Sequence, residues 1–390
     1  MNNNLKICLI TPAYFPAISY GGPINSVKLI AEELVKLGNK VSVFTSAFGL
    51  DENKSKKEII NKVEVYYFKY FIFKRWIISF SLLKELWKQR NNFDIFHINL
   101  IWDPISWLSG FLLSLSERKI IISPRGTVEK ELIRGHNYFL KKIVYYLFLR
   151  FIFNKTTGFH FSSQREREKF FEFTKINKNF KIVYNPFYFE EFDKKIDKNL
   201  LKKFNLLDKR YILYFGRISW KKRIELLIEA FNELTKEIKD FYLAIIGSSE
   251  KDYFERLKKK IEAFNLDDKV ILFGETIYGD EKIVLYQNAH FFVLPSISEN
   301  FGYVVLEALA SRVPVIVSDG VALKDIVEKY KVGLVFKDKT ELVSEMKNLT
   351  NENFYNQLKK NLENSLELIK KDFLPQKLAR EILSFYLSLL

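Results

Sequence analysis

The sequence predicts an α/β fold made of two doubly wound domains in tandem, and three observations support this fold class. The chain has 390 residues, which is more than one ordinary hydrophobic core accommodates, so two domains are expected. In both halves, short apolar runs alternate with longer amphipathic stretches, a pattern typical of parallel sheets flanked by helices. Between residues 185 and 208 this pattern gives way to turn-forming and charged residues, starting at Asn185-Pro186. We therefore expect two Rossmann-like domains that enclose a cleft.

The apolar runs define the strands that each sheet is expected to contain. In the first half they are residues 7–11, 41–45, 63–68, 95–98, 120–123 and 158–162. In the second half they are residues 211–215, 241–246, 270–273, 291–294, 315–318 and 333–336. The predicted domains are residues 1–190 and 191–370. The last segment, 371–390, carries an apolar face that we expect to pack back toward the first domain.

The composition is that of a globular protein, and it excludes several kinds of site. With 48% hydrophobic and 28% charged residues, the chain can bury a sizeable core and stay hydrated. The single cysteine, Cys8, excludes an intramolecular disulfide and a thiolate metal cluster. The four histidines, at positions 97, 136, 160 and 290, show no metal-ligand spacing, and the sequence has no Asp-x-Asp triplet. We therefore predict no metal site.

No segment has the pattern of a secretory signal or of a membrane span. The first six residues lack the charged lead and the long apolar stretch of a signal. The longest apolar region, near 101–116, is interrupted by Asp103 and Pro104 and falls short of the roughly 20 residues that a span requires. We expect a cytoplasmic protein.

The positive charge is concentrated in the first half of the chain. Residues 1–195 contain 31 Lys and Arg against 18 Asp and Glu, a net charge of +13, whereas the remainder has a net charge of +2. This asymmetry suggests an anionic partner for the first domain, such as a lipid surface on the inner face of a membrane or a phosphorylated acceptor. Residues 68–90 and 139–150 mix aromatic and basic side chains. Each stretch either lies on an anionic membrane or is a helix whose aromatic face is core.

Polar residues that follow the predicted strands are the first candidates for a ligand site. After strand 211–215 come Gly216 and Arg217, and Lys222 opens the next helix. The planar guanidinium of Arg217 and the compact charge of Lys222 together suit a diphosphate and would neutralise an anionic leaving group without a metal. The alternative is a solvated strand end followed by a basic helix start.

A second candidate site follows strand 291–294, where Glu299 and Glu307 stand eight residues apart, about two helical turns. If a helix begins near Phe301, its first backbone amides face an anion. These amides belong to Phe301, Gly302, Tyr303 and Val304. A sugar nucleotide fits this spacing, with its diphosphate at the helix N-terminus, its ribose on Glu307 and its sugar on Glu299. The alternative makes Glu299 a helix-dipole partner and Glu307 a solvated residue, although apolar neighbours surround Glu307.

These residues resemble the motifs of family 4 glycosyltransferases. The resemblance is most specific at Gly216-Arg217 with Lys222, at Glu299 with Glu307, and at residues 314–318. It implies the GT-B fold, a retaining and metal-independent hexosyl transfer, and no cofactor beyond a UDP- or GDP-linked sugar donor. It also implies that Arg217 and Lys222 bind the diphosphate, Glu307 the ribose and Glu299 the donor sugar. The expected acceptor is a glycan or a lipid-linked glycan of cell-surface polysaccharide synthesis, such as lipopolysaccharide or capsule.

The first domain supplies further candidates. Gly21 and Gly22, in the loop after the first strand, would let backbone amides approach phosphate closely, and in similar enzymes this loop covers the donor. His97 and Asn99 end strand 95–98, where a lone histidine is as often structural as functional. Arg125 stands where many relatives have a histidine, and it would bind an acceptor phosphate or sugar oxygen.

Two departures from the family pattern concern glycines. Similar enzymes have glycine where this chain has Arg223 and Arg312. We expect these arginines to alter local packing or the acceptor rim and to leave donor binding intact.

Two other interpretations remain open. A nucleotide-sugar epimerase or a phosphorylase shares this fold, but epimerases lack both residue pairs, and phosphorylases need a pyridoxal-binding lysine and usually a far longer chain. A basic membrane scaffold or nucleic-acid-binding protein would account for the charge, but not for two carboxylates beside an anion-binding helix. We expect no nucleic acid partner.

Overall fold

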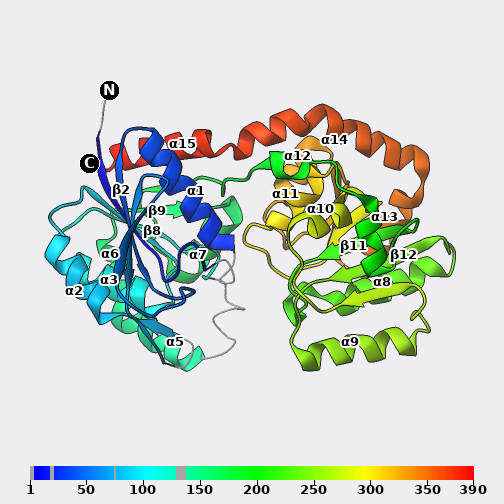
Figure 1. The fold of residues 1–390 in the computed structure, drawn as a ribbon, viewed down its shortest axis with the longest axis horizontal. Coiled ribbons are helices and arrows are strands. Elements are labelled where there is room, and N and C mark those ends of the chain that lie inside the picture. The colour runs from blue at the N-terminus through cyan, green and yellow to red at the C-terminus, as the bar shows by residue number, and fades with distance from the viewer. Residues whose placement is uncertain (1–3, 18–21, 74–75, 129–137) are drawn as a thin grey trace. The chain divides into compact units, whose positions relative to one another are not determined.

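The computed structural model describes residues 4–17, 22–73, 76–128 and 138–390 of the chain. They form two compact units (Figure 1). Unit 1 comprises Met1–Phe187 and Phe373–Leu390, and unit 2 comprises Tyr188–Asp372. The chain therefore passes from unit 1 to unit 2 after Phe187 and returns to unit 1 at Phe373.

Unit 1 is built on an eight-stranded sheet with the order β10-β9-β8-β7-β1-β2-β4-β3. Its strands are β1 (Lys6–Ile10), β2 (Lys40–Ser46), β3 (Lys56–Ile60), β4 (Val63–Phe68), β7 (Ile95–Asn99), β8 (Ile120–Ser123), β9 (Gly158–Phe161) and β10 (Phe180–Ile182). All neighbours are parallel except β3 and β4. The six strands expected from the sequence are present. The two additional strands, β3 and β10, lie at the sheet edges, where largely exposed residues give no apolar run.

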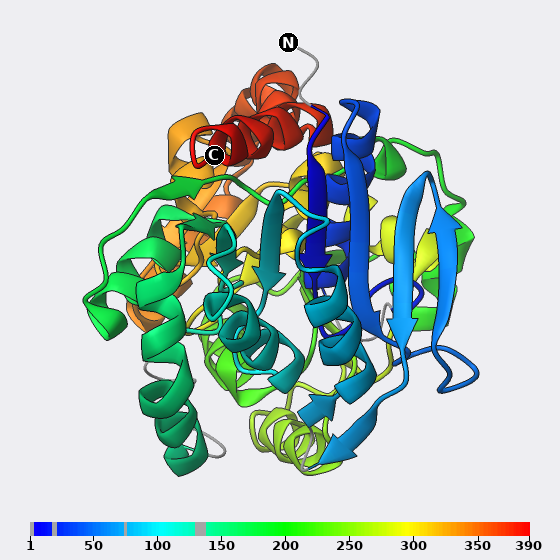
Figure 2. The same cartoon turned by 90° about the vertical axis from the view of Figure 1, so that its left-hand side faces the viewer.

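Alternation along the central strand divides the core of unit 1 into two layers. Ile7 and Leu9 of β1 belong to one apolar cluster, while Cys8 and Ile10 belong to the other. The first layer is covered by α1 (Gly22–Lys36) and α15 (Pro375–Leu387), which lie side by side (Figure 1). The second layer is covered by α2 (Phe80–Gln89), α3 (Pro104–Ser114), α6 (Arg150–Lys155) and α7 (Gln164–Thr174). In Figure 2, α2 and α3 lie in front of the sheet.

The apolar face of the last helix is buried in unit 1. Leu378, Ile382 and Phe385 recur at helical spacing on α15 and join the cluster that contains the central strands. Thus α15 completes the core of unit 1, although it follows the whole of unit 2 in the sequence.

The basic and aromatic stretch 68–90 is not a single helix. Residues Phe71–Phe73 (β5) and Trp76–Ile78 (β6) form a two-stranded antiparallel sheet, and only then does α2 begin. The helical alternative for the whole stretch is therefore wrong. Ser79 ends the hairpin and caps α2 by accepting a hydrogen bond from the Leu82 amide.

Unit 2 is a six-stranded parallel sheet with the order β13-β12-β11-β14-β15-β16. Its strands are β11 (Arg210–Phe215), β12 (Phe241–Ile246), β13 (Val270–Phe273), β14 (Phe291–Leu294), β15 (Val315–Ser318) and β16 (Gly333–Phe336). Its α-helices are α8 (Ile224–Thr235), α9 (Lys251–Ala263), α10 (Gly279–Gln287), α11 (Tyr303–Ala310), α12 (Lys324–Tyr330), α13 (Lys339–Thr350) and α14 (Glu352–Phe373). Five of the six strands match the predicted bounds, and β11 begins one residue earlier.

The strand order of unit 2 determines where a ligand is expected. The chain runs outward from β11 to β13 and then returns to the other side of β11 as β14. The carboxyl ends of β11 and β14 therefore adjoin at the point where the order reverses, which is where open α/β sheets bind their ligands.

None of the helices in the described part of the chain combines the length and the apolar character that a bilayer crossing needs.

Candidate functional site

The loop after β11 is shaped by two closely apposed glycines. Gly216 and Gly247, which follow β11 and β12, have φ angles of +143° and +147°. A Cβ atom on Gly247 would lie 2.0 Å from the carbonyl oxygen of Gly216, so only glycine fits there. Arg217 comes next, with an exposed side chain and a backbone carbonyl that accepts a hydrogen bond from the Tyr214 hydroxyl at 2.8 Å.

The short helix η5 (Trp220–Lys222) is fastened to the loop after β14 by three contacts. The Ile297 amide donates to the Lys221 carbonyl at 2.9 Å. Arg223 donates from Nε to the Pro295 carbonyl at 2.6 Å. The third contact is an ion pair between Lys222 and Glu299. The two predicted motifs, distant in sequence, therefore meet at the switch point of the sheet.

The loop after β15 holds the backbone of Glu299 on both sides. The Glu299 amide donates to the Gly320 carbonyl at 3.0 Å, and the Glu299 carbonyl accepts from the Ala322 amide at 3.0 Å. A Cβ on Gly320 would lie 2.1 Å from the Ile297 carbonyl oxygen, so this close approach also requires glycine. Glu299 is thus positioned by backbone contacts that leave its carboxylate directed at Lys222.

Helix α11 begins at Tyr303, two residues later than expected from the sequence. Gly302, with φ +91°, occupies the N-cap position, and a left-handed residue cannot belong to the helix. The Phe301 side chain is buried and lies against the Tyr303 ring, with centroids 4.9 Å apart. The amides of Tyr303 and Val304 therefore open the helix, and the earlier start at Phe301 is wrong.

Glu307 is buried on α11 and is held by two residues of α10. The residue is only 8% exposed. Lys282 contacts its Oε1 at 2.5 Å, and the Tyr286 hydroxyl donates to its Oε2 at 2.9 Å. Burial of the phenol beside this carboxylate raises the pKa of Tyr286, so the hydroxyl stays protonated and remains a donor.

Lys282 and Tyr286 were missed in the sequence. Lys282 and Tyr286 are four residues apart, which places both side chains on one face of α10. Nothing in the sequence indicates that this face contacts Glu307. A buried carboxylate requires partners, and that requirement was the only available clue.

Arg223 and Arg312 both adopt the left-handed backbone conformation, with φ angles of +49° and +59°. This is a conformation that glycine adopts without strain, which fits the glycine that the family pattern leads us to expect at both places. In this chain each arginine has a contact that glycine cannot make. Arg223 binds the Pro295 carbonyl, and Arg312 pairs with Asp193 at 3.0 Å.

Of the two glycines predicted in the first loop, Gly22 begins α1, while Gly21 lies outside the described residues.

The three acceptor candidates of unit 1 come together, but inside the protein. Arg125 donates from Nε and Nη2 to the Asn99 Oδ1 at 3.1 and 2.9 Å, and from Nη1 to the Asn185 side chain. His97, Asn99 and Arg125 are all buried. Their role toward an acceptor stays a prediction, and the structure buries all three side chains, Arg125 in the loop after β8 and His97 and Asn99 at the end of β7.

A buried carboxylate supports this loop. Glu166 of α7 accepts hydrogen bonds from the Gly126 amide at 2.6 Å and from the Ser162 amide at 2.6 Å. Burial raises its pKa, while these hydrogen bonds and the nearby Arg125 charge act in the opposite direction. Sequence reasoning gave no sign of this residue.

Two histidines of unit 1, His97 and His160, form a directed hydrogen-bond chain that ends on α15. Burial lowers the pKa of His97 well below its usual value and that of His160 to about 3, so both rings are neutral. Because the Val183 carbonyl can only accept, His160 donates to it from Nε2 at 3.1 Å and must accept at Nδ1. His97 therefore donates from Nε2 to His160 at 3.4 Å and accepts at Nδ1 from the Tyr386 hydroxyl at 2.6 Å.

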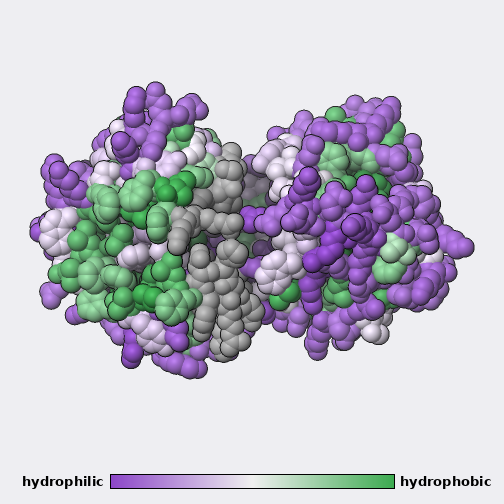
Figure 3. All heavy atoms as spheres, turned by 90° about the horizontal axis from the view of Figure 1, so that it is seen from below, coloured by the Kyte–Doolittle hydropathy of each residue, from purple (hydrophilic) through white to green (hydrophobic). Residues whose placement is uncertain are grey.

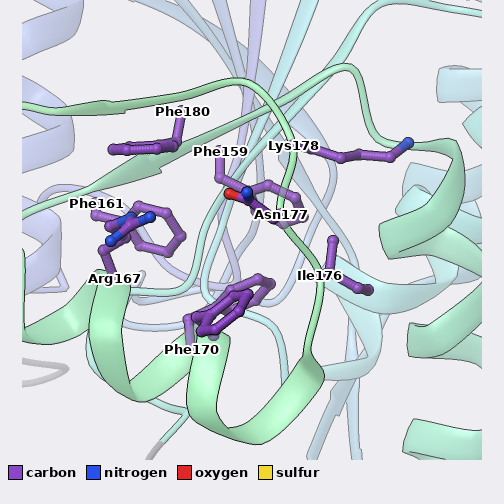
Figure 4. Close-up of a pocket in the computed structure, with 9 residues that line it drawn as sticks. Phe159, Phe161, Arg167, Phe170, Ile176, Asn177, Lys178 and Phe180 are labelled. Atoms are coloured by element: carbon purple, nitrogen blue, oxygen red, sulfur yellow. The ribbon is translucent and has the colours of Figure 1, made fainter.

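A hollow in unit 1 is lined by Phe159, Phe161 and Phe170, with Arg167 over the Phe180 ring at 4.5 Å (Figure 4). These rings also pack on one another, so the hollow belongs to the aromatic core. Within the described ranges, no group of three or more His, Cys, Asp or Glu residues is arranged to hold a metal ion.

Comparison with known families gives two matches that together cover most of the chain. Residues 20–190 match the profile described as Glycosyltransferase Family 4, and residues 196–365 match the profile described as Glycosyl transferases group 1.

Similar proteins extend over both units. An uncharacterized glycosyltransferase of Methanocaldococcus jannaschii is 27% identical over 341 residues, which span 83% of each chain. The alpha-monoglucosyldiacylglycerol synthase of Streptococcus pneumoniae is 26% identical over 352 residues, 87% of this chain and 76% of the relative. Among solved structures, Anabaena HepE in complex with UDP and glucose has a TM-score of 0.72 at 16% identity, covering 98% of this chain and 100% of that one.

Proposed function

We propose a specific reaction for this chain, which belongs to the family 4-type glycosyltransferases of GT-B fold. The reaction moves a hexose from a UDP- or GDP-linked donor to a glycan or a lipid-linked glycan, with retention of anomeric configuration and without a metal ion. Its setting is the cytoplasmic side of a membrane, in the synthesis of a cell-surface polysaccharide such as lipopolysaccharide or capsule.

The single observation that carries the proposal is the meeting of Lys222 and Glu299 at the switch point of unit 2. Arg217 lies just after the neighbouring strand, β11. Helix α11 begins at Tyr303, three residues after Asn300 in the same loop as Glu299. Cations and a helix N-terminus at one place suit the two phosphates of a nucleotide sugar. Glu307, buried but with both oxygens accepting hydrogen bonds, suits the vicinal hydroxyls of a ribose.

The ion pair suggests how the site exchanges partners when a donor binds. A diphosphate carries more negative charge than the Glu299 carboxylate, so it competes for the Lys222 ammonium. The freed carboxylate then accepts hydrogen bonds from the hydroxyls of the transferred sugar. When the donor is bound, Glu299 therefore forms hydrogen bonds to the sugar. The Lys222 ammonium then pairs with the diphosphate that becomes the leaving group.

The proposed chemical step is a displacement on one face of the sugar. The bond from the anomeric carbon to the β-phosphate oxygen breaks, and the acceptor oxygen bonds to the same face. The acceptor proton passes to the departing phosphate oxygen. Arg217, Lys222 and the N-terminus of α11 stabilise the negative charge that develops on that oxygen.

The acceptor-side residues enter the proposal as positioning residues. Arg125, in the loop after β8, binds Asn99 at the end of β7, and His97 fixes the same strand through its hydrogen bond with Tyr386. In this form they set the shape of an acceptor-binding loop that they do not line.

The relatives support the classes of donor and acceptor. HepE was solved with UDP and glucose, and the Streptococcus relative is named for a glucosylated diacylglycerol. A UDP-linked hexose and a lipid-borne acceptor are therefore the first compounds to test.

The test is hydrolysis of a panel of nucleotide sugars, read as released nucleoside diphosphate, followed by transfer to an added acceptor. Lys222→Ala is expected to lower turnover at saturating donor by about 100-fold or more, because charge on the leaving group loses its main partner. Lys221→Ala is the matched control, since its ammonium lies on the same turn at 5.7 Å from the Trp220 ring. Normal turnover in Lys222→Ala would reject the proposal.

A further inference from the structure

Unit 1 exposes a row of large apolar side chains on a continuous helical segment. This segment comprises α5 (Tyr138–Val144), the π-helical turn η2 (Tyr145–Leu149) and α6. We call its exposed side the apolar ridge, which consists of Phe139, Ile143, Tyr146, Leu147 and Phe151. Phe139 is 75% exposed and Leu147 64% exposed, whereas soluble proteins bury most such residues.

The opposite side of the segment is already used by the core. Val144, Leu149, Ile152 and Phe153 are buried in the second apolar layer of unit 1. One face of the segment therefore packs into the core of unit 1. The apolar ridge is a second apolar face, which lies outside this core.

The ridge lies within a broader apolar region. Helix α3 contacts η2 and α6 on one side and α2 and β6 on the other. Next to α2, the exposed residues Phe71, Ile72 and Phe73 form strand β5, and the Phe71 and Phe80 rings lie 5.6 Å apart. Figure 3 shows hydrophobic side chains gathered on one face of unit 1.

The charges around the ridge are almost all positive. Residues 138–155 contain four Lys and Arg and no Asp or Glu, and residues 69–90 contain six Lys and Arg and one Glu. Lys142 and Arg150 are exposed and alternate with the ridge residues along the helix. Cations with long stems beside aromatic and aliphatic side chains fit a boundary between acyl chains and negative headgroups.

We propose that the apolar ridge docks unit 1 on a bilayer that contains anionic phospholipid. The ridge side chains enter the outer part of the acyl region, while Lys142 and Arg150 bind the headgroup phosphates. This deepens the proposed function, because an acceptor carried on a lipid has to be met at a membrane surface. A second copy of the chain is the competing occupant, but its equally basic ridge would face this one with like charge.

The test is flotation of the full chain with vesicles of phosphatidylcholine alone or with about 30% phosphatidylglycerol. The wild-type chain is expected to float with the anionic vesicles, and less so as salt rises. Phe139→Ser with Leu147→Ser should lower the vesicle partition coefficient by about tenfold or more. Ile59→Ser is the matched control, because Ile59 is 71% exposed on the edge strand β3 and should bind as wild type.

The charge contribution is tested separately. Lys142→Glu with Arg150→Glu should abolish the preference for anionic vesicles, whereas Lys258→Glu with Lys259→Glu, the same charge change on exposed positions of α9, should not. The proposal would be overturned if the Phe139/Leu147 variant and the Lys142/Arg150 variant both floated like the wild-type chain, or if the wild-type chain did not float. A lipid-free dimer that the ridge variants convert to a monomer would also overturn it.

Donor hydrolysis in solution separates this proposal from the proposed function. The ridge variants should hydrolyse nucleotide sugars at the wild-type rate, since none of the changed residues lies in unit 2. A wild-type chain that floats but releases no nucleoside diphosphate would contradict the transferase proposal alone.

Discussion

The phenol of Tyr286 holds the buried carboxylate of Glu307, to which the proposed function assigns the ribose of the donor. It donates to the Oε2 of Glu307 at 2.9 Å and thereby aims the buried carboxylate. Without this bond, the carboxylate keeps only Lys282 and can turn away from an incoming ribose.

Tyr286→Phe is therefore expected to weaken donor binding about tenfold or more, because one hydrogen bond to a charged group contributes roughly 1.5–3 kcal/mol. Turnover at saturating donor should change little, because the ribose does not react. The measurement is KM and kcat for nucleotide-sugar hydrolysis, with Tyr278→Phe, an exposed residue at the start of the same helix, as control. An unchanged KM would remove Tyr286 from the site.

Among the connecting elements, the loop after β15 determines where Glu299 stands. Its Gly320 lies against the Ile297 carbonyl, and its backbone binds the amide and carbonyl of Glu299. A side chain at position 320 has no room, because a backbone atom and not a flexible side chain occupies the space.

Gly320→Ala should therefore push the two loops apart and lower transferase activity at least tenfold through displacement of Glu299. Gly38→Ala is the control, since a Cβ there meets nothing within 4 Å and adds only left-handed strain of about 1 kcal/mol. Activity and melting temperature are measured together. Full activity in Gly320→Ala would show that the loop adapts without moving Glu299.

Helix α15 is joined to its unit by a polar contact as well as by apolar packing. The Tyr386 hydroxyl is the first donor of the chain through His97 and His160. Tyr386→Phe leaves Nδ1 of His97 buried without its donor, which should destabilise unit 1 by about 1–3 kcal/mol. Urea unfolding measures this loss. No loss in Tyr386→Phe would contradict the proposed direction of the hydrogen bonds.

At the scale of the whole molecule, the buried histidines make stability depend on pH. Their pKa values are lowered in the folded state, so the unfolded chain binds more protons below its usual histidine pKa of about 6.5. Stability is therefore fully present above that pH and is lost as pH falls toward the folded value, about 3 for His160.

Each such histidine should contribute a slope of about 1.4 kcal/mol per pH unit in this window. Urea unfolding between pH 7.5 and 5 measures the total slope, to which the carboxylates and His290 also contribute. The informative comparison is with His160→Gln. The free energy of unfolding of this variant should change less with pH than that of the wild-type chain, whatever its value at pH 7.5. Equal slopes would show that His160 is not neutral in the folded state.

The sequence by itself determined the parallel sheets and the candidate pairs of site residues. Strands that are buried on both faces consist of continuous apolar runs. The bounds of the central strands, such as 241–246 and 315–318, could therefore be predicted to within one residue. Arg217, Lys222 and Glu299 could be picked out as candidates because they follow buried strands, where open α/β sheets bind ligands, and Glu307 because its neighbours are apolar.

Only the tertiary structure decided which of these residues touch, and with what. The edge strands β3 and β10 and the β5–β6 hairpin depend on pairing between segments and leave no periodicity of their own. Likewise, the pairing of Lys222 with Glu299 and the support of Glu307 by α10 depend on helix and loop placement across the sheet. The burial of His97 and Arg125 could not be read from their positions either, because α15 arrives from the far end of the chain to close over that side of unit 1. Local chemistry is encoded along the sequence, whereas the partner of each group is set by long-range packing, which short-range patterns do not contain.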